Sequence, residues 1–459
     1  MRTEFPAPPT GTRKPRASFL VLSVHPHPTL LVGFDPRTAL AVARSLHRQG
    51  IRVLVATVAP WETPIRSAAI EQFIPLPDAE VGSATFLSAL LRLIKIHAVN
   101  TVLPITDRAL VRLGPHASLL RACVRLAMAG RRPLATILNK SATARLAESL
   151  GVPVPRTRTV THEHEIEPAA AALGFPLFVK ARDKSRLCTG GQVPVQDARC
   201  CTSLEDFRRA VKAISGPLLA QSFIEGDDVG VILLLGDGEM LSGFQYRARR
   251  LHPAEGGVCV MAETEPLDTR LRDSALALLR ALRWEGVAQL DFRQNPQTGA
   301  YALLEVNGRF WGSTAVAVRA GADFPFAVWQ WLHGQRPAMG RYVTGLRARW
   351  LEGDLRRLAS LLQSRRHGAG RLFREFATIA WDFRPGVRGM LWDWRDPVPA
   401  LDLLRTLAGA WLRRRLRGVH TPVPGLHTVP GTAEVLALPR GTGARHPGRS
   451  RHRPSVAAP

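Results

Sequence analysis

Short apolar runs alternate with helical patterns over the first third of this chain, and this alternation constrains the fold more than any other feature. Strand-like runs occur at 19–24 (FLVLSV), 29–34 (TLLVGF), 51–60 and 99–105. Helical spacing of apolar residues is found between them, at 36–49 and 83–97. Strands that alternate with helices predict a parallel sheet covered on both faces. The first turn, 33–38 (GFDPRT), lacks the GxGxxG pattern of a dinucleotide site.

The charge of the chain is high but unevenly distributed. The length of 459 residues indicates several domains. The formal net charge of +25 raises the question of nucleic-acid binding. Residues 413–459 hold nine arginines against the single acid Glu434. No aromatic–basic RNA motif or zinc module accompanies this charge. Contact of the basic tail with nucleic acid or a membrane surface is therefore a minor alternative, and the basic middle would attract anionic ligands.

The chain shows no sign of membrane insertion or secretion. No run of about 18 uncharged apolar residues is present, and the polar, Pro-rich N-terminus lacks the apolar stretch of a signal peptide. Five cysteines form no CxxC pair, so we expect reduced thiols. These features predict a cytoplasmic protein.

A second group of strands and helices follows from about residue 134. A helical stretch ends at Gly151, and two prolines then force an extended exit. Strands are predicted at 175–181 (FPLFVKA, which carries Lys180), 218–226, 229–235 and 239–247. A polar loop at 182–191 ends in two glycines. Residues 286–313 predict a hairpin with its turn at 295–299.

Polar side chains lie on this predicted hairpin. Because side chains alternate along a strand, Glu305 and Asn307 share one face, about 6–7 Å apart. Asp291 on the neighbouring strand faces them, and Arg309 continues the alternation. Two carboxylates and an amide oxygen suit Mg²⁺ (or Mn²⁺) that phosphates also hold. A solvated hairpin edge is the alternative, but polar alternation directly after an apolar strand favours a site.

The hairpin resembles the magnesium-binding hairpin of the ATP-grasp superfamily, with 13 residues between Asp291 and the EVNGR segment. This superfamily includes D-alanine–D-alanine ligase, biotin carboxylase and carbamoyl-phosphate synthetase. Other segments resemble the superfamily in the same order along the chain: NKSATARLAESLGVPVPRT (139–157), FPLFVKA and LLAQSFIEGDDVGV (218–231). RRLHPAEGG (249–257) and EVNGRFWGS look like a carboxylate–amine ligase branch, related to the carbamoyl-phosphate synthetase large chain.

The resemblance implies an ATP- and Mg²⁺-dependent ligase that phosphorylates a carboxylate to an acyl phosphate and joins it to an amine. It implies phosphate contacts for Lys140 and Lys180, and metal ligation by Asp291, Glu305 and Asn307. The hinge residues Gln221, Ser222, Phe223 and Ile224 would meet adenine. Asp228 would accept the ribose hydroxyls, and Arg309 would stabilise the transferred phosphoryl group.

The sequence departs from the superfamily at two places. Gln221 stands where many members have a glutamate that accepts the adenine amino proton, although a glutamine carbonyl can still accept it. The loop 182–191 has fewer glycines than a usual phosphate-binding lid loop and carries Lys184 and Cys188.

The substrate side of the predicted site is less specific. Arg247 and Arg250 could receive a substrate carboxylate, and Gly256 and Gly257 allow close backbone approach. A basic solvent-exposed face is an equal alternative for the arginines.

Five segments are expected. Residues 1–17 are a disordered N-terminus and 18–133 an α/β domain with a parallel sheet. Residues 134–338 are an α+β ATP-grasp domain whose two subdomains grip ATP, with a lid at about 155–222. Residues 339–418 are a helical C-terminal extension and 419–459 a disordered basic tail. The helix near 401–417 is apolar early and basic late, so it either lies on an anionic membrane surface or docks on its own domain.

Three other functions remain open from the sequence. One is a carboxyphosphate-forming carboxylase or a carbamoyl-phosphate-synthetase-like enzyme, although no biotin or glutaminase partner is visible in this chain. Another is an inactive ATP-binding regulatory module. The third is a nucleic-acid or membrane adaptor. The expected partners are a small carboxylate and an amine, and a homodimer is left open.

Overall fold

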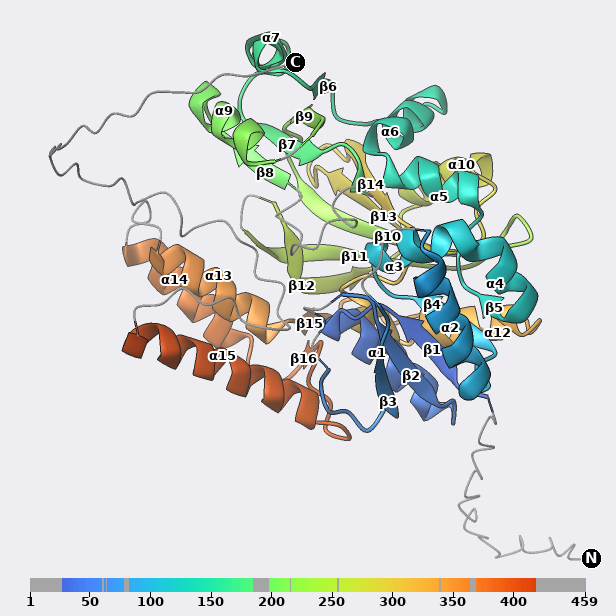
Figure 1. Ribbon diagram of the computed structural model, residues 1–459. Coiled ribbons are helices and arrows are strands. Elements are labelled where there is room, and N and C mark those ends of the chain that lie inside the picture. Colours follow the sequence, from blue (N-terminus) through green and yellow to red (C-terminus); the bar gives the residue numbers. More distant parts are fainter. Residues whose placement is uncertain are drawn as a thin grey trace, which may run out of the picture.

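The computed structural model describes residues 27–59, 62, 64–77, 82–184, 198–214, 216–253, 256–337, 340–363 and 369–417. These residues form three sheets of five, four and seven strands, with helices packed around them (Figure 1). The predicted disordered ends, 1–17 and 419–459, and the predicted strand at 19–24 lie outside the described residues.

The first sheet is parallel throughout, with strand order β3-β2-β1-β4-β5. Its strands are β1 (Thr29–Val32), β2 (Val53–Thr57), β3 (Gln72–Pro75), β4 (Thr101–Pro104) and β5 (Arg125–Leu126). Its helices include α1 (Pro36–Arg48), α2 (Ala84–Ile96), α3 (Asp107–Leu113) and α4 (Ala117–Cys123). Leu31 packs in the core that contains α1, whereas Leu30 packs in the core that contains α2. The predicted parallel sheet with both faces covered is therefore confirmed.

Helix α1 begins where its sequence provides a cap. The Asp35 carboxylate accepts the backbone N–H of Thr38 at 3.0 Å, and Pro36 follows with its φ already suited to a helix. The chain turns away after the helix at Gly50, whose φ is +73°. These signals place the start of α1 at the carboxyl edge of the parallel sheet.

The second sheet belongs to the predicted lid. It is antiparallel, with order β6-β9-β7-β8, and contains β6 (Thr157–Val160), β7 (Leu177–Ala181), β8 (Ala198–Cys201) and β9 (Leu218–Ser222). Two helices cover it, α7 (Ile166–Leu173) and α9 (Leu204–Ala213). Its buried residues, including Val179 and Phe207, form a separate hydrophobic cluster. The lid therefore has a core of its own.

The third sheet is the largest, with order β14-β13-β10-β11-β12-β15-β16. Its strands are β10 (Asp227–Gly236), β11 (Glu239–His252), β12 (Val258–Glu265), β13 (Gly286–Gln294), β14 (Tyr301–Asn307), β15 (Arg347–Arg349) and β16 (Val387–Gly389). Its helices include α10 (Thr269–Ala281), α11 (Thr314–Arg319) and α12 (Phe324–Leu332). Val231 and Leu233 pack in the α2 core, whereas Ile232 packs in the α1 core. The large sheet and the parallel sheet thus share both of their cores.

The C-terminal part differs from the prediction. Helices α13 (Leu351–Gln363), α14 (Ala369–Trp381) and α15 (Val398–Arg417) form a layer beside the large sheet (Figure 1). The predicted helical extension is confirmed in part, because the segment also contains two short strands: β15 pairs with β12 and β16 pairs with β15. Strands of three residues are too short to show an alternating pattern.

The predicted domain boundaries stay predictions. The boundary at residue 134 falls inside α5 (Arg131–Leu138), which is followed directly by α6 (Lys140–Ser149). The boundary at 338 falls between α12 and β15, although β15 returns to the large sheet.

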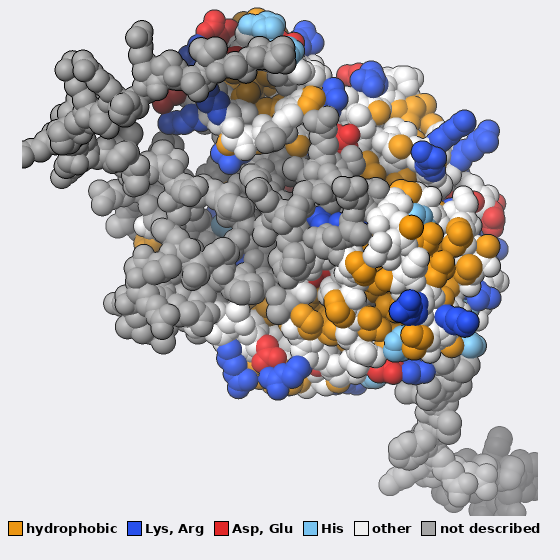
Figure 2. Space-filling model, in the orientation of Figure 1, with side chains coloured by type: hydrophobic (Ala, Val, Ile, Leu, Met, Phe, Trp, Pro, Cys, Tyr) orange, Lys and Arg blue, Asp and Glu red, His pale blue; other side chains and the backbone are white. Residues whose placement is uncertain are grey.

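The surface shows how the charge of the described residues is arranged. Figure 2 shows Lys and Arg side chains scattered among acidic and apolar ones on the face that it presents.

Within the described part of the chain, no helix has the length and apolar character that a membrane span requires.

The separate lid core leads to a first prediction. Phe207 is 0% exposed, so Phe207→Ala should cost the lid about 3–5 kcal/mol. Hydrogen exchange should then speed up in β7 and β9 while β1 and β10 keep their protection, because local opening follows separate cores. The exposed Arg209→Ala on the same helix is the matched control. Equal loss of protection in β10 would contradict an independent lid core.

Candidate active site

The β13–β14 hairpin brings the predicted metal ligands together. Asp291 lies directly opposite Glu305, and Gln289 lies opposite Asn307. The Asn307 amide nitrogen donates to both carboxylates, at 3.1 Å to Asp291 Oδ2 and 3.1 Å to Glu305 Oε1. The same nitrogen lies 3.3 Å from Gln289 Oε1. The three predicted oxygen donors therefore form one contiguous cluster.

Two buried lysines meet this cluster from other segments. Lys184 Nζ donates to Asn307 Oδ1 at 2.8 Å and lies 3.4 Å from Glu305 Oε2. Lys140 Nζ lies 3.7 Å from the same Glu305 oxygen. Both lysine side chains are nearly inaccessible, whereas Glu305 remains 26% exposed. Glu305 is thus the point at which three segments of the chain converge.

Backbone pairing explains why these two lysines are neighbours. Lys140 is the first residue of α6, which Asn139 caps by accepting the Ala142 N–H at 2.9 Å. Asn139 forms an isolated bridge with Asp183, just beyond β7. The Lys140 N–H also donates to the Arg182 carbonyl at 3.0 Å. These bonds join the start of α6 to the end of β7, so Lys140 and Lys184 reach the hairpin side by side.

Lys180 approaches from strand β7 itself. Val179 and Ala181 point into the lid core, so Lys180 and Phe178 occupy the opposite face of the strand. Burial raises the pKa of Asp228 above its usual value, and the positive charges of Arg293 and Lys180 only partly oppose this.

The two hairpin carboxylates titrate in opposite directions. Burial raises the pKa of Glu305, but Lys184, Lys140 and Lys180 more than offset this and hold that pKa well below its usual value. Burial, followed by repulsion from Glu305 and Asp228, raises the pKa of Asp291 well above its usual value. The charges of Lys184 and Arg309 lower this pKa but do not offset the increase, so a cation bound beside Asp291 would favour its ionised form.

The donor set fits a magnesium ion that is shared with phosphates. Among the described residues, no group of three or more His, Cys, Asp or Glu is arranged to hold a metal. The hairpin instead offers two carboxylates and one amide oxygen, and Mg²⁺ commonly takes one or two carboxylates together with substrate phosphates and water. A shared site of this kind would depend on nucleotide for its remaining ligands.

A small pocket lies between the lid and the hairpin. Its lining includes Lys140, Gln221, Leu304 and Glu305. The cavity volume is about 10 Å³, enough for about one water molecule, so a nucleotide base could enter only if the lid moved. A larger groove of about 650 Å³ between β3 and α2 contains none of the predicted site residues.

The hinge residues lie at the edge of this pocket. The Gln221 amide nitrogen donates to Thr157 Oγ1 at 3.2 Å, and the Ser222 N–H donates to the Arg156 carbonyl at 2.9 Å. Phe223 stacks on Phe178, with ring centroids 6.2 Å apart. Ile224 follows β9 directly. This segment connects the lid to the large sheet.

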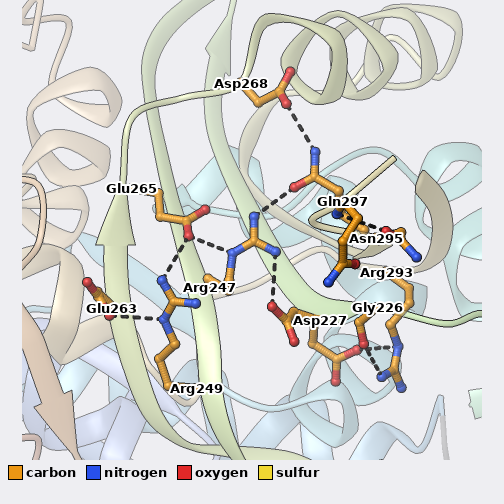
Figure 3. Close-up of polar contacts among 12 residues, drawn as sticks. Gly226, Asp227, Arg247, Arg249, Glu263, Glu265, Asp268, Arg293, Asn295 and Gln297 are labelled. Carbon is orange, nitrogen blue, oxygen red and sulfur yellow. Dashed lines mark hydrogen bonds and ion pairs between the residues drawn. The ribbon is translucent and has the colours of Figure 1, made fainter. Parts of the chain in front are cut away.

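Asp228 is tied to the large sheet by an arginine. Arg293 Nε lies 2.9 Å from Asp228 Oδ1, and another nitrogen of Arg293 donates to the Gly226 carbonyl at 3.0 Å (Figure 3). The Arg293 guanidinium also lies 6.0 Å from the centre of the Phe223 ring. Arg293, which the sequence did not single out, thus joins the predicted ribose-binding residue to the hinge.

The predicted substrate arginines are already paired. Arg247 contacts Glu265, Asp227 and Gln294, in a network that also holds Arg249 (Figure 3).

Arg250 is buried and binds Asp354 at 2.6 Å and Asp382 at 2.9 Å. Releasing either arginine to a substrate would leave carboxylates without their charge partner. The prediction that Arg247 and Arg250 receive a substrate carboxylate does not fit this arrangement.

The two predicted glycines permit close approach of the backbone. A Cβ on Gly257 would lie 2.3 Å from the His252 carbonyl oxygen, which leaves no room for a side chain. A Cβ on Gly256 would lie 3.0 Å from the Phe178 ring of the lid. Gly256 therefore lies where the large sheet meets the lid.

Arg309 is held by a residue that the sequence analysis missed. Asp107, the first residue of α3, accepts from Arg309 Nε at 2.9 Å and from Nη2 at 2.7 Å. Burial lowers the pKa of Arg309, but Asp107 more than offsets this and raises it above its usual value. Asp107 therefore fixes the orientation of the Arg309 guanidinium, and the contact of Arg309 with phosphates stays a prediction.

Asp107 and Lys184, like Arg293, were not among the predicted site residues, and the sequence marks Asp107 and Lys184 to different degrees. Asp107 follows a predicted strand at the carboxyl edge of a parallel sheet, where ligand-binding residues commonly lie. Lys184 was noted only as part of an unusual loop, since its contact with Asn307 depends on the pairing of Asn139 with Asp183.

Comparison with known proteins agrees with this architecture. No family model matches the chain. A carbamoyl phosphate synthase large chain from Methanothermobacter thermautotrophicus is 38% identical over 79 residues, which is 17% of this chain and 7% of that protein. A D-alanine–D-alanine ligase A from Bradyrhizobium diazoefficiens is 26% identical over 231 residues, covering 46% of this chain and 61% of the ligase. The chain thus spans less than two thirds of these relatives.

A solved structure matches over more of the chain. The ADP complex of an N5-carboxyaminoimidazole ribonucleotide synthetase aligns with a TM-score of 0.55 and 15% identity, over 78% of this chain and 97% of the synthetase. The shared architecture comprises the parallel-sheet domain, the small antiparallel sheet and the large mixed sheet. In sequence the chain is similar to segments of these ATP-grasp enzymes, and in fold it is similar to the synthetase.

The lysine–carboxylate contact gives a second prediction. Glu305→Gln and Lys184→Met should be coupled by about 1–3 kcal/mol in a double-mutant cycle of unfolding, because each change leaves the other group buried with less compensation. Glu305→Gln combined with the exposed Lys212→Met is the control and should be additive. Additivity of the first pair would show that Lys184 does not bind Glu305 in solution.

Proposed function

We propose that this protein is an ATP- and Mg²⁺-dependent ligase that phosphorylates a carboxylate to an acyl phosphate and joins it to an amine. The convergence of two buried lysines, Lys140 and Lys184, on the oxygen cluster of the β13–β14 hairpin carries the proposal. Phosphoryl transfer requires charge neutralisation and positioning more than covalent chemistry from the protein. A cluster of ammonium groups beside a metal-binding hairpin meets both requirements.

The nucleotide would lie between the lid and the hairpin. Gln221, Ser222, Phe223 and Ile224 would border the adenine, with the Gln221 carbonyl oxygen as acceptor for its amino group. Leu304 lines the pocket beneath Gln221. The Asp228 carboxylate would accept hydrogen bonds from the ribose hydroxyls. These bonds would replace part of its contact with Arg293. The narrow pocket implies that the lid opens to admit ATP.

The phosphates would replace protein carboxylates as partners of the lysines. Lys140, Lys180 and Lys184 would each contact phosphate oxygens, and a compact ammonium suits a single oxygen.

The ligands Asp291, Glu305 and Asn307 would hold Mg²⁺, which neutralises phosphate charge and orients the γ-phosphate. Lys184 now donates to Asn307 Oδ1, so its move to phosphate would free that oxygen for the metal.

The reaction would then occur in two transfers. A substrate carboxylate oxygen attacks the γ-phosphorus and ADP leaves, which forms the acyl phosphate. The amine attacks the acyl carbon, and inorganic phosphate leaves with the bonding electron pair. Arg309 would stabilise the charge of the transferred phosphoryl group, with Asp107 fixing the orientation of its guanidinium.

The relatives support this chemistry at the level of reaction class. A D-alanine–D-alanine ligase joins a carboxylate to an amine. Its alignment with this protein covers 46% of this chain. The substrates would be a small-molecule carboxylate and an amine.

The first test of the proposal is thermal unfolding with ATP and Mg²⁺. At about one hundred times its Kd, the nucleotide should raise the free energy of unfolding by about 2.7 kcal/mol. The rise should require Mg²⁺ and should be lost in Glu305→Ala, whereas the exposed Glu285→Ala should keep it.

The reaction class is then tested by ADP release. Release that requires both an acid and an amine supports the ligase, and release with bicarbonate alone would support the carboxyphosphate alternative. Folded protein that neither binds millimolar ATP nor shifts its melting temperature would refute the proposal.

A further inference from the structure

Helix α14 turns an aromatic side toward solvent. Phe373 is 72% exposed, Phe376 is 58% exposed and Trp381 is 66% exposed. At about 100° per residue these positions share one side of the helix, together with the exposed Ala377 and Ala380. Exposed aromatic side chains gathered on one side of a helix are unusual on a soluble protein.

The opposite side of α14 holds the helix to the protein. Ile379 is buried, and its carbonyl accepts from Arg349 at 2.9 Å. Glu375 is paired with Arg357 of α13. Asp382 follows the helix and binds the buried Arg250 of β11 at 2.9 Å. The orientation of α14 is therefore fixed, and its aromatic side faces outward as a consequence.

The aromatic surface continues beyond the helix. Phe383 is 66% exposed, and the guanidinium of Arg349 lies 3.7 Å from the centre of its ring. We call Phe373, Phe376, Trp381 and Phe383 the aromatic face. These four residues lie within 373–383, in the layer of C-terminal helices (Figure 1).

Charge is segregated around the aromatic face. The acids Glu375 and Asp382 point inward to arginines of the protein. The Arg374 side chain is exposed beside the face, and the Arg384 guanidinium lies 5.2 Å from the centre of the Trp381 ring. The exposed Arg388 follows in the next strand. The outward surface is therefore apolar and bordered by positive charge.

We propose that the aromatic face binds the surface of an anionic lipid bilayer. Aromatic side chains insert at the level of the headgroups, and arginines beside them pair with anionic headgroups. The face is short and lies on one side of a helix, as in proteins that rest on a membrane without crossing it. The proposal does not depend on the ligase activity.

The same charges argue against a second copy of the chain as the partner. A two-fold interface places identical patches against each other, so the arginines around one aromatic face would meet those around its copy. Anionic lipids neutralise these charges instead. The phosphates of a nucleic acid would also neutralise the arginines. A nucleic acid has no hydrocarbon region, however, in which the aromatic side chains could be buried.

The test is flotation of the full-length protein with two kinds of vesicle. Vesicles of phosphatidylcholine containing about 30% phosphatidylglycerol should bind the protein about tenfold more tightly than vesicles of phosphatidylcholine alone. The triple variant Phe373→Ser, Phe376→Ser, Trp381→Ser should lose about tenfold or more of this affinity, because the apolar contact is removed. The exposed Val343→Ser elsewhere on the surface is the matched control and should bind as the native protein does.

Several results would overturn the proposal. They are absence of binding to the anionic vesicles, equal binding to neutral vesicles, and unchanged binding by the triple variant. A change from dimer to monomer in the triple variant, without vesicle binding by the native protein, would assign the face to self-association. If the triple variant fails to fold, Trp381→Ser and Phe376→Ser measured singly decide the question, and each should weaken binding.

Discussion

The contact between Glu305 and the two buried lysines is the interaction on which the rest of the candidate site depends. It joins β14, the start of α6 and the segment after β7, which lie far apart along the chain. Burying ammonium groups is costly unless a carboxylate accompanies them. In the absence of nucleotide, Glu305 supplies that charge. In the proposed function, phosphate oxygens would replace Glu305 as partners of the lysines, and the Glu305 carboxylate would then bind the metal.

The hydrophobic cores determine which parts of the protein can move to admit the nucleotide. The parallel sheet and the large sheet share both of their cores, so they form one continuous base. The lid has its own core. It is connected to the base by the hinge around Phe223, by the backbone bonds between the start of α6 and the end of β7, and by the contact of Lys184 with Glu305. Opening would break the polar contacts and leave the hydrophobic cores intact. In the proposed function, this division would let the lid close on a ligand held by the hairpin.

The sequence predicted those features that depend on local patterns. Alternation along β14 placed Glu305 and Asn307 on one face, and the strand–helix order predicted the parallel sheet. Features that depend on distant partners could not be predicted in this way. Arg250 is paired with Asp354 and Asp382, which lie 104 and 132 residues further along the chain. Lys184 likewise reaches the hairpin because Asp183 pairs with Asn139. The spacing of residues along the sequence does not indicate this pairing. The two short strands of the C-terminal part carry too few residues to show a period.

The central claim is that the hairpin binds a divalent metal together with ATP. The most direct measurement is electron paramagnetic resonance of Mn²⁺ titrated into the protein with and without ATP. Here Mn²⁺ stands in for Mg²⁺, as both prefer oxygen ligands. The account predicts protein-bound Mn²⁺ that requires ATP and disappears in Asp291→Asn, while the fold is retained. Nucleotide-dependent Mn²⁺ binding that survives in both Asp291→Asn and Glu305→Gln would contradict the account, because the metal would then lie elsewhere.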